Sequence, residues 1–304
     1  MPDGLSQPLN QPRTIFGLAT GAFLISFSSI FVRLSAVGPT TAGFYRMLFG
    51  ALALALAALL LRERWRVASH TLLWSLAAAL MFAADLSVWH RSIDRVGPGL
   101  ATVLGNFQVF VMIGAGALFL GERVTGRTLG AVALAIAGLL LLVGPGWGSL
   151  SPAWRLGVLL GLATAFFYAA YMMILRRMQQ AARNPSPIWS MTLMALFCSL
   201  LLGLEVPLVG ERFAIPDLAS LAFLLAYGIL CQALGWYLLS SNIPRATLGV
   251  TGITILLQPA LSFAWDMLLF DRPTTLLDLT GALLTLTAIY YGVTRQKRLP
   301  EAAA

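Results

Sequence analysis

Two short motifs place a polar side chain four residues before a tryptophan. Asp85-x-x-x-Trp89 occurs in the first half of the chain, and Gln232-x-x-x-Trp236 occurs in the second half. Residues four apart lie on one face of a helix, so each polar group shares a face with an indole ring. A carboxyl or amide beside an aromatic ring can hydrogen-bond the polar end of a small molecule while the ring stacks on its apolar part.

Other polar and aromatic side chains follow helical spacings in neighbouring apolar segments. Two further amides, Gln108 and Gln258, occupy corresponding places in the two halves. Hydroxyl, amide and aromatic groups within about one turn of one another add the candidates Ser26, Ser29, Thr102, Asn106, Phe167, Tyr168, Tyr171, Thr251 and Thr254. An unpaired polar group in an apolar interior is costly, so such groups pair with one another or with a ligand. We expect all these side chains to line one binding site or pathway.

Catalytic and metal chemistry have little support in the sequence. Ser87, His90 and Asp94 fall at helical spacings of 3 and 4, but nothing nearby suggests an oxyanion hole, and chance is the better explanation. The two cysteines, Cys198 and Cys231, each lie inside an apolar segment, where they pack as small hydrophobic side chains. The sequence predicts no catalytic residues, no metal site and no cofactor.

The elements that carry the candidate residues are long apolar helices. Hydrophobic residues make up 59% of the chain and charged residues 11%, against roughly 45 to 50% and about 25% in soluble domains. A bilayer must therefore be the solvent. A ruler of about 20 apolar residues per crossing gives ten spans: 14–33, 40–61, 71–91, 97–120, 127–143, 154–175, 185–204, 218–240, 246–269 and 274–293. Only the fifth is short, which fits a helix at the edge of a bundle or one that thins the bilayer slightly.

The basic residues indicate how these spans are oriented. Over ten crossings, thirteen of them fall on the N-terminal side and six on the opposite side, with Arg46 inside the second span. Cytoplasmic loops carry the excess of Lys and Arg, so both termini are expected in the cytoplasm. The net charge of +8 thus reflects topology and contact with anionic membrane lipid, and we expect no nucleic-acid partner.

The two halves together predict an all-α integral membrane protein with ten transmembrane helices. An odd number of spans per half means that the second half enters the membrane from the opposite side, so the five-helix repeats are inverted. We expect the repeats at residues 14–146 and 147–295, with cytoplasmic tails at 1–13 and 296–304. Within the repeats, Gly17-x-x-x-Gly21 and Gly157-x-x-x-Gly161 predict close helix packing.

Several short motifs accompany this architecture. An acidic–basic doublet closes the fourth and ninth spans, a glycine lies in the helix after each doublet, and the second and ninth spans carry an arginine and a proline. These are Glu122-Arg123 and Asp271-Arg272, Gly130 and Gly281, Arg46, and Pro259. In these features the chain resembles the EamA type of the drug/metabolite transporter superfamily, over residues 14–295. It departs from that pattern in having Val109 opposite Pro259, and Asp271 where glutamate is usual.

The resemblance implies export or exchange of small metabolites, and among bacterial members it is most similar to the YddG-like exporters of aromatic amino acids. No motif here specifies the substrate. We expect an inner-membrane transporter that works by alternating access, with a small-molecule site between the halves and membrane lipid around it. The oligomeric state stays open, a monomer included. The alternatives are a lipid-modifying membrane enzyme and a channel.

Three side chains inside or beside the spans need separate interpretation. Asp85 is the most deeply placed carboxyl, and an uncompensated charge at the midplane costs at least about 2.5 kcal/mol. It either carries a proton during export or pairs with His90, Arg91 or Arg95. We expect Arg46 to extend to the outer interface rather than contact substrate, and His90 to meet head groups or water.

The two tryptophans of the paired motifs also have two interpretations. Trp89 and Trp236 both lie toward the end of a span, where interfacial belts of aromatic side chains occur. They could equally form gates across a pathway. Their corresponding positions in the two halves favour one shared role without specifying it.

Overall fold

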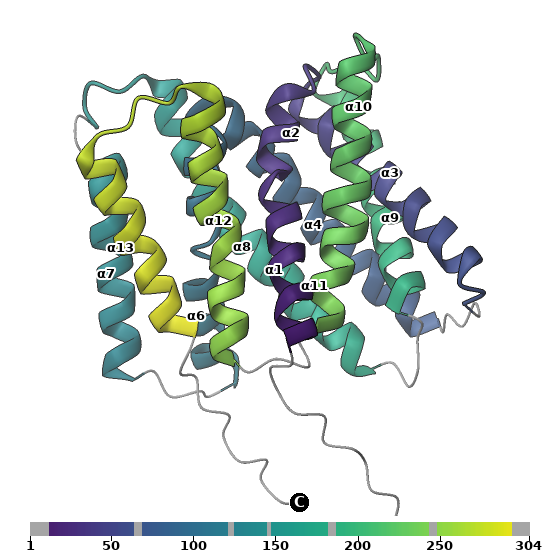
Figure 1. Cartoon of the computed structure of the whole chain (residues 1–304), viewed down its shortest axis with the longest axis horizontal. Helices are drawn as coiled ribbons and strands as arrows, with labels where there is room; N and C mark the ends of the chain where they lie inside the picture. The colour runs from purple at the N-terminus through teal and green to yellow at the C-terminus, as the bar shows by residue number, and fades with distance from the viewer. Residues whose placement is uncertain are drawn as a thin grey trace, which may run out of the picture.

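The chain forms a bundle of helices that begins and ends on the same side. The computed structural model describes residues 12–63, 69–120, 125–144, 147–181, 187–242 and 248–293. Every regular element in these ranges is a helix, and α1 begins at the same end of the bundle as α13 finishes (Figure 1). The Glu122-Arg123 doublet and most of both expected tails lie outside the described ranges.

The first half contains seven helical segments, several of which join into single spans. They are α1 (Pro12–Ser26), α2 (Ser28–Leu34), α3 (Pro39–Leu60), α4 (Ser69–Val96), α5 (Pro98–Gly105), α6 (Gln108–Leu120) and α7 (Gly126–Val143). Pro39 and Pro98 open α3 and α5, where a missing backbone N–H costs nothing. Gly97 precedes α5 with φ +88°, a conformation that favours glycine.

The second half repeats this order with one irregular helix. Its segments are α8 (Pro152–Ala181), α9 (Pro187–Leu208), α10 (Leu218–Ala226), the π-helix η1 (Tyr227–Gly235), α11 (Trp236–Asn242), α12 (Leu248–Phe270) and α13 (Leu276–Val293). Asp217 caps α10 by accepting a hydrogen bond from the Ser220 N–H at 2.7 Å. That bond lowers the pKa of the Asp217 carboxyl.

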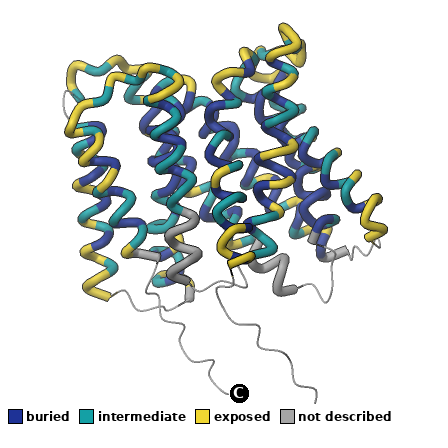
Figure 2. Tube along the Cα trace, in the orientation of Figure 1, coloured by how far each residue is buried: buried dark blue, intermediate teal, exposed yellow. Residues whose placement is uncertain are grey.

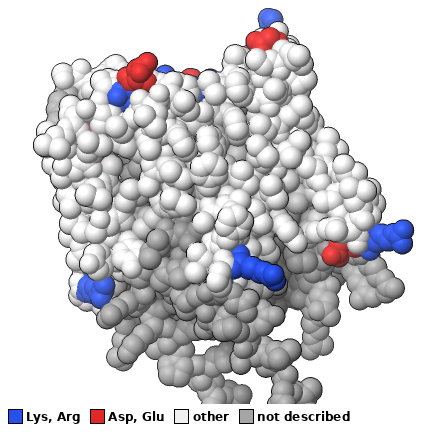
Figure 3. Space-filling model, viewed as in Figure 1, with Lys and Arg blue, Asp and Glu red and all other residues white. Residues whose placement is uncertain are grey.

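The helices make the chain a multi-pass membrane protein. Eight stretches are long and apolar enough to cross a bilayer, and two shorter apolar stretches, Leu256–Phe270 and Leu276–Tyr291, complete the series. All ten segments expected from the sequence overlap these helices. On the face drawn in Figure 3, charged side chains lie toward the two ends, with an uncharged band between them.

The spans formed by α1 and α2 and by α5 and α6 are each interrupted, and side-chain hydrogen bonds satisfy part of the freed backbone. At the break between α1 and α2, the Ser26 carbonyl accepts a hydrogen bond from the Ser262 hydroxyl at 2.9 Å. The Leu24 carbonyl accepts one from the Cys231 thiol at 3.1 Å. Between α5 and α6, the Asn106 amide donates to the Thr102 carbonyl at 2.8 Å. Such pairing is what makes broken helices tolerable within a membrane.

The main contacts between helices are pseudo-symmetric, so a contact made by a helix of one half has a counterpart in the other half. In the first half α4 packs against α8 and α9, and in the second half η1 packs against α1 and α3. Helices α3 and α9 pack against each other, as do α5 and α12. The remaining pair, α7 and α13, lies at one side of the bundle (Figure 1). Both helices expose more of their surface than the central ones (Figure 2), which fits the expected place of the short fifth span.

Glycines set the closest approaches between helices. A Cβ on Gly21 would lie 2.9 Å from the Gly235 carbonyl oxygen, and one on Gly161 would lie 2.7 Å from a Leu104 methyl carbon. Gly17 and Gly157 are equally crowded, by Asn242 and Arg95. The packing role expected for the two Gly-x-x-x-Gly pairs is therefore confirmed.

Candidate functional site

A buried guanidinium lies between α3 and η1. Arg46 on α3 is only 3% exposed. Its Nε donates to Oε1 of Gln232 and its Nη1 donates to the Tyr227 hydroxyl, both at 2.9 Å. The expectation that Arg46 extends to the interface is wrong, because η1 supplies an amide and a hydroxyl that satisfy these donors inside the bundle. Arg46 thereby ties a first-half helix to a second-half helix.

Tyr227 connects this guanidinium to a buried histidine. Nε2 of His90 lies 2.9 Å from the Tyr227 hydroxyl oxygen, and His90 is fully buried. Arg46 donates to that oxygen, so the hydroxyl proton is free to be donated to Nε2. The expectation that His90 meets head groups is wrong as well. Gly43 makes room for the ring, since a Cβ there would lie 3.1 Å from His90 Nδ1.

Asp85 lies in the same buried region and forms no ion pair with any residue that the structure describes. It is 4% exposed, interacts electrostatically with Arg46, and its Oδ1 has no hydrogen-bond partner among the described residues. The structural partners expected for it are engaged elsewhere. His90 bonds Tyr227, Arg91 pairs with a glutamate, and Arg95 donates to the Arg91 carbonyl.

Four aromatic rings adjoin the charged cluster on the side toward α11. The Phe82 ring stacks on Tyr171 with a centroid distance of 4.5 Å, and Trp236 meets both rings edge to face at 6.4 and 6.3 Å. Tyr168 lies 6.3 Å from Trp236. The Arg46 Cζ is 5.3 Å from the Phe82 centroid, so the aromatic cluster begins directly beside the guanidinium.

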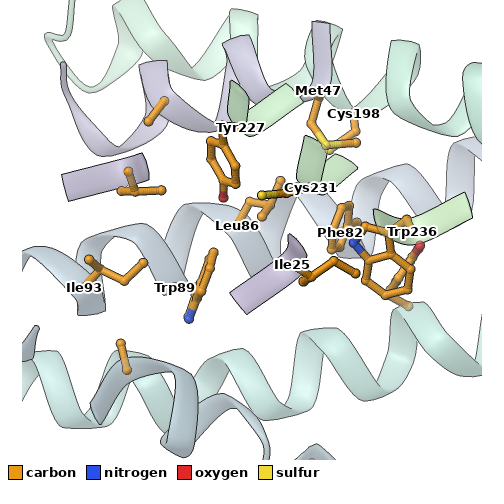
Figure 4. Packing of buried hydrophobic residues seen from close by; sticks show 14 of the residues in the cluster. Ile25, Met47, Phe82, Leu86, Trp89, Ile93, Cys198, Tyr227, Cys231 and Trp236 are labelled. Carbon is orange, nitrogen blue, oxygen red and sulfur yellow. The ribbon is translucent and has the colours of Figure 1, made fainter. Parts of the chain in front are cut away.

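The close-up view shows how these groups follow one another along the bundle. Tyr227 lies on one side of Leu86 and Cys231, and Phe82 and Trp236 lie on the other side (Figure 4). The Nε1 of Trp236 is buried without a hydrogen-bond partner among the described residues. The site thus has a polar part at Arg46 and an aromatic part at Trp236.

The other sequence-predicted residues fall into several environments. Trp89 lies beside His90, with ring centroids 5.3 Å apart. Ser29 and Gln108 are buried with oxygens that have no partner in the described part of the chain. Phe167 and Gln258 are half-buried, and the side chains of Thr251 and Thr254 lie outside the described residues.

Three predicted polar residues serve their own helices. Thr102 donates to the Pro98 carbonyl at 2.7 Å, and Asn106 donates to the Thr102 carbonyl. Ser26 donates to the Phe23 carbonyl at 2.7 Å and accepts from Trp265. These bonds hold helix breaks and turns rather than joining the Arg46 cluster.

A second polar network lies at the far end of the bundle, opposite the end where α1 begins. Arg91 on α4 pairs with Glu205 on α9 at 2.8 Å. Ser87 donates to the same Glu205 oxygen at 2.6 Å, and Arg91 also donates to Thr40 at 3.0 Å. This network connects α3, α4 and α9. Because Ser87 bonds Glu205 and His90 bonds Tyr227, the Ser87, His90 and Asp94 trio does not assemble into a catalytic site.

A third network at that end joins α12 to α5. Asp266, 1% exposed, accepts a hydrogen bond from the Gly99 N–H at 3.0 Å and pairs with Arg272 at 3.1 Å. A carboxylate is favourable there because it faces the N-terminus of α5. A Cβ on Gly99 would lie 3.1 Å from that of Asp266, so glycine permits the contact.

Comparison with known proteins agrees with a duplicated transporter. The EamA-like transporter family matches residues 12–144 and again residues 155–294. The chain belongs to the EamA-like transporter family. Arg46 and Asp85 come from the first copy, and Tyr227, Gln232 and Trp236 come from the second. An EamA transporter of this kind is not an enzyme, so the lipid-modifying alternative is not favoured.

Individual relatives are similar over about two thirds of the chain. A protein of Escherichia coli (strain K12) named "Probable amino-acid metabolite efflux pump" is 28% identical over 202 residues, which cover 64% of this chain and 67% of that protein. A Salmonella typhimurium protein of the same name is 25% identical over 201 residues, with the same coverage. A solved crystal structure shares the fold at a TM-score of 0.66 and 16% identity, over 95% of this chain and 100% of that one.

Proposed function

We propose that this EamA transporter exports small metabolites of the amino-acid class across the inner membrane by alternating access. The observation that carries the proposal is the buried cluster at the junction of the halves, in which Arg46 of the first copy donates to Gln232 and Tyr227 of the second. Amides, hydroxyls and aromatic rings at such a junction suit a molecule with a polar and an apolar end. Both relatives carry the name "Probable amino-acid metabolite efflux pump".

The topology that we propose has ten spans and both termini in the cytoplasm. Three features support it: α1 begins where α13 finishes (Figure 1), the basic residues favour that side, and the packing is preserved on exchange of the halves. Five spans per half make the repeats inverted. A site between inverted halves can face each side of the membrane in turn.

Access to this site requires helices to separate. Arg46, Asp85, His90 and Gln232 are each less than 5% exposed. At the far end, the pairs Arg91–Glu205 and Gly99–Asp266 hold neighbouring helices together, the first by an ion pair and the second by a backbone hydrogen bond to the carboxylate. We assign these pairs to a closed extracytoplasmic gate, which must open before substrate leaves.

Counterflow in proteoliposomes tests the proposed function. Purified transporter is reconstituted with a high internal concentration of one amino acid, and uptake of the labelled form is followed for a panel of amino acids and amines. A carrier accelerates uptake when preloaded, because the loaded site returns faster than the empty one. An uptake rate that does not change with preloading would indicate a channel. No uptake of any amino acid would contradict the proposal.

Proton coupling by Asp85 is a separate part of the proposal. Asp85 is buried on α4 with an oxygen that has no hydrogen-bond partner among the described residues, which leaves that oxygen free to take up a proton. Asp85→Asn cannot exchange that proton, so export should lose its response to an imposed pH gradient. An unchanged response in the reconstituted variant would exclude this role.

A further inference from the structure

We infer that Arg46 and Asp85 together bind the carboxylate and the ammonium of a free α-amino acid, whose large apolar or aromatic side chain lies among Phe82, Tyr168, Tyr171 and Trp236. The inference rests on the proposed function and names the chemical class of its substrate. It assigns each of the two charged groups an oppositely charged partner on one zwitterion, because neither Arg46 nor Asp85 forms an ion pair among the described residues.

Arg46 supplies the first argument, because its guanidinium forms no ion pair with a described carboxylate. Its two hydrogen bonds go to an amide and a hydroxyl. Among the described residues the ion pairs are Arg91–Glu205 and Arg272–Asp266, so no described carboxylate lies within 4.0 Å of the guanidinium. Asp85 interacts with Arg46 electrostatically without forming that contact, and burying two charges that lack direct contact is expensive. A carboxylate from a ligand would supply the direct contact and the short, charge-assisted hydrogen bonds that guanidinium groups favour.

Asp85 and Trp236 supply the second argument, because each keeps a buried polar atom without a partner. Asp85 is 4% and Trp236 8% exposed, and neither Oδ1 nor Nε1 has a hydrogen-bond partner in the described part of the chain. Buried polar atoms are nearly always paired, and a ligand between the two helices that carry them would supply the partners that these two atoms lack. An ammonium matches Oδ1, and a ring or carbonyl acceptor matches the indole N–H.

The dimensions of the site supply the third argument. The Arg46 Cζ lies 5.3 Å from the Phe82 centroid, and Phe82 stacks on Tyr171 and meets Trp236. In phenylalanine the carboxylate carbon lies about 5 Å from the ring centre by standard bond lengths. A carboxylate held at Arg46 therefore places the amino-acid side chain beside the aromatic cluster.

The test uses three probes that differ only in their charged groups. L-Phenylalanine carries both groups, phenethylamine lacks the carboxylate, and 3-phenylpropionate lacks the ammonium. Binding of each labelled probe to the purified full-length protein is measured by equilibrium dialysis. We expect the wild type to bind L-phenylalanine more tightly than either analogue, because only the amino acid engages both Arg46 and Asp85.

Two variants should produce opposite patterns. Arg46→Gln should weaken binding of L-phenylalanine and 3-phenylpropionate about ten- to hundredfold, the range of a hydrogen bond to a charged group, and leave phenethylamine unchanged. Asp85→Asn should weaken L-phenylalanine and phenethylamine and leave 3-phenylpropionate unchanged. Arg33→Gln is the control, because Arg33 is an exposed arginine whose guanidinium lies over Phe270, and it should change none of the three.

The other possible results contradict either this inference or the proposed function. If Arg46→Gln weakens all probes equally, or if the wild type does not prefer L-phenylalanine, the inference is overturned. If Arg46→Gln does not fold, Arg46→Lys should still prefer the carboxylate probes, because it keeps the charge; loss of that preference with retained fold overturns it too. The predicted binding pattern without counterflow would leave the site standing and contradict the transport function instead.

Discussion

Tyr227 is the residue on which the buried polar cluster depends. Its hydroxyl accepts from Arg46 and lies within hydrogen-bond distance of His90, so one oxygen serves two otherwise buried groups. Removing a hydroxyl that satisfies buried partners costs the desolvation of those partners as well as the bond. The stability of the cluster and its function are therefore connected at a single atom.

Tyr227→Phe should lower the free energy of unfolding by about 1 to 3 kcal/mol, because Arg46 and His90 each lose a partner. Thermal unfolding of the purified protein in detergent measures the change. Tyr45→Phe is the matched control. It also removes a hydroxyl, whose bond to the Phe213 carbonyl lies at an exposed site, so its effect should be smaller. An equal loss of unfolding free energy in the two variants would show that the buried cluster is no more important for stability than the exposed hydrogen bond.

At this scale the sequence predicts one part of the site and misses another. Asp85, Gln232 and Trp236 were identifiable because their positions correspond in the two halves. Arg46 was misplaced because depth along a span was the only guide, and the partners that retain it inside come from another helix. Thr102 follows the expected spacing, yet it bonds its own backbone. Spacing shows which face a side chain shares and not what it binds.

The π-helix η1 explains why Tyr227 escaped a search based on helical spacing. Tyr227 and Gln232 are five residues apart, a separation that an α-helix places on different faces. In a π-helix the backbone hydrogen bonds run from residue i to i+5, and both side chains then reach Arg46. The positions of the spans can be predicted from hydrophobicity alone. The change from α-helix to π-helix cannot, because it does not alter the apolar composition of the segment.

The close contact between α3 and η1 depends on two glycines. A Cβ on Gly228 would lie 2.5 Å from that of Phe49 and 2.9 Å from the Gly50 nitrogen. Gly228→Ala should therefore force the helices apart, lower stability by about 1 to 3 kcal/mol, and reduce counterflow by moving Gln232 away from Arg46. Thermal unfolding and counterflow of the variant measure the two effects.

Gly114→Ala is the control for that substitution. A Cβ on Gly114 would have no neighbouring atom within 4 Å, and alanine is the better helix former by up to about 1 kcal/mol. Its stability should be unchanged or raised. If Gly228→Ala behaved like Gly114→Ala, the contact between α3 and η1 would be less tight than the structure indicates.

The whole molecule is organised as two copies that meet at one buried centre, with α7 and α13 beside it. The network around Glu205 joins α3, α4 and α9 at the far end, whereas α7 and α13 pack mainly on each other. Opening at that end should therefore involve the first group of helices and leave the α7–α13 pair in place.

Glu205→Gln should loosen the far end selectively. Losing a partly exposed ion pair lowers the free energy of local opening by up to about 1 kcal/mol. This corresponds to about two- to fivefold faster amide exchange. Hydrogen–deuterium exchange should detect this in peptides covering the end of α4 and not in those covering α7. Asp278→Asn, which removes a carboxylate at the start of α13, should leave α4 unchanged. Faster exchange in α7 would show that the two groups of helices do not open separately.

The Arg91–Glu205 pair and the Arg46–Asp85 cluster, each with one member on α4, also differ in their exposure to ions in solution. Arg91 and Glu205 expose 23% and 29% of their side chains, whereas Arg46 and Asp85 are almost entirely enclosed. The screening length falls from about 8 Å at 0.15 M salt to about 3 Å at 1 M, and buried charges are screened far less than exposed ones. Concentrated salt should therefore speed gate opening while leaving ligand affinity at the centre unchanged, so ionic strength alone can separate release from recognition.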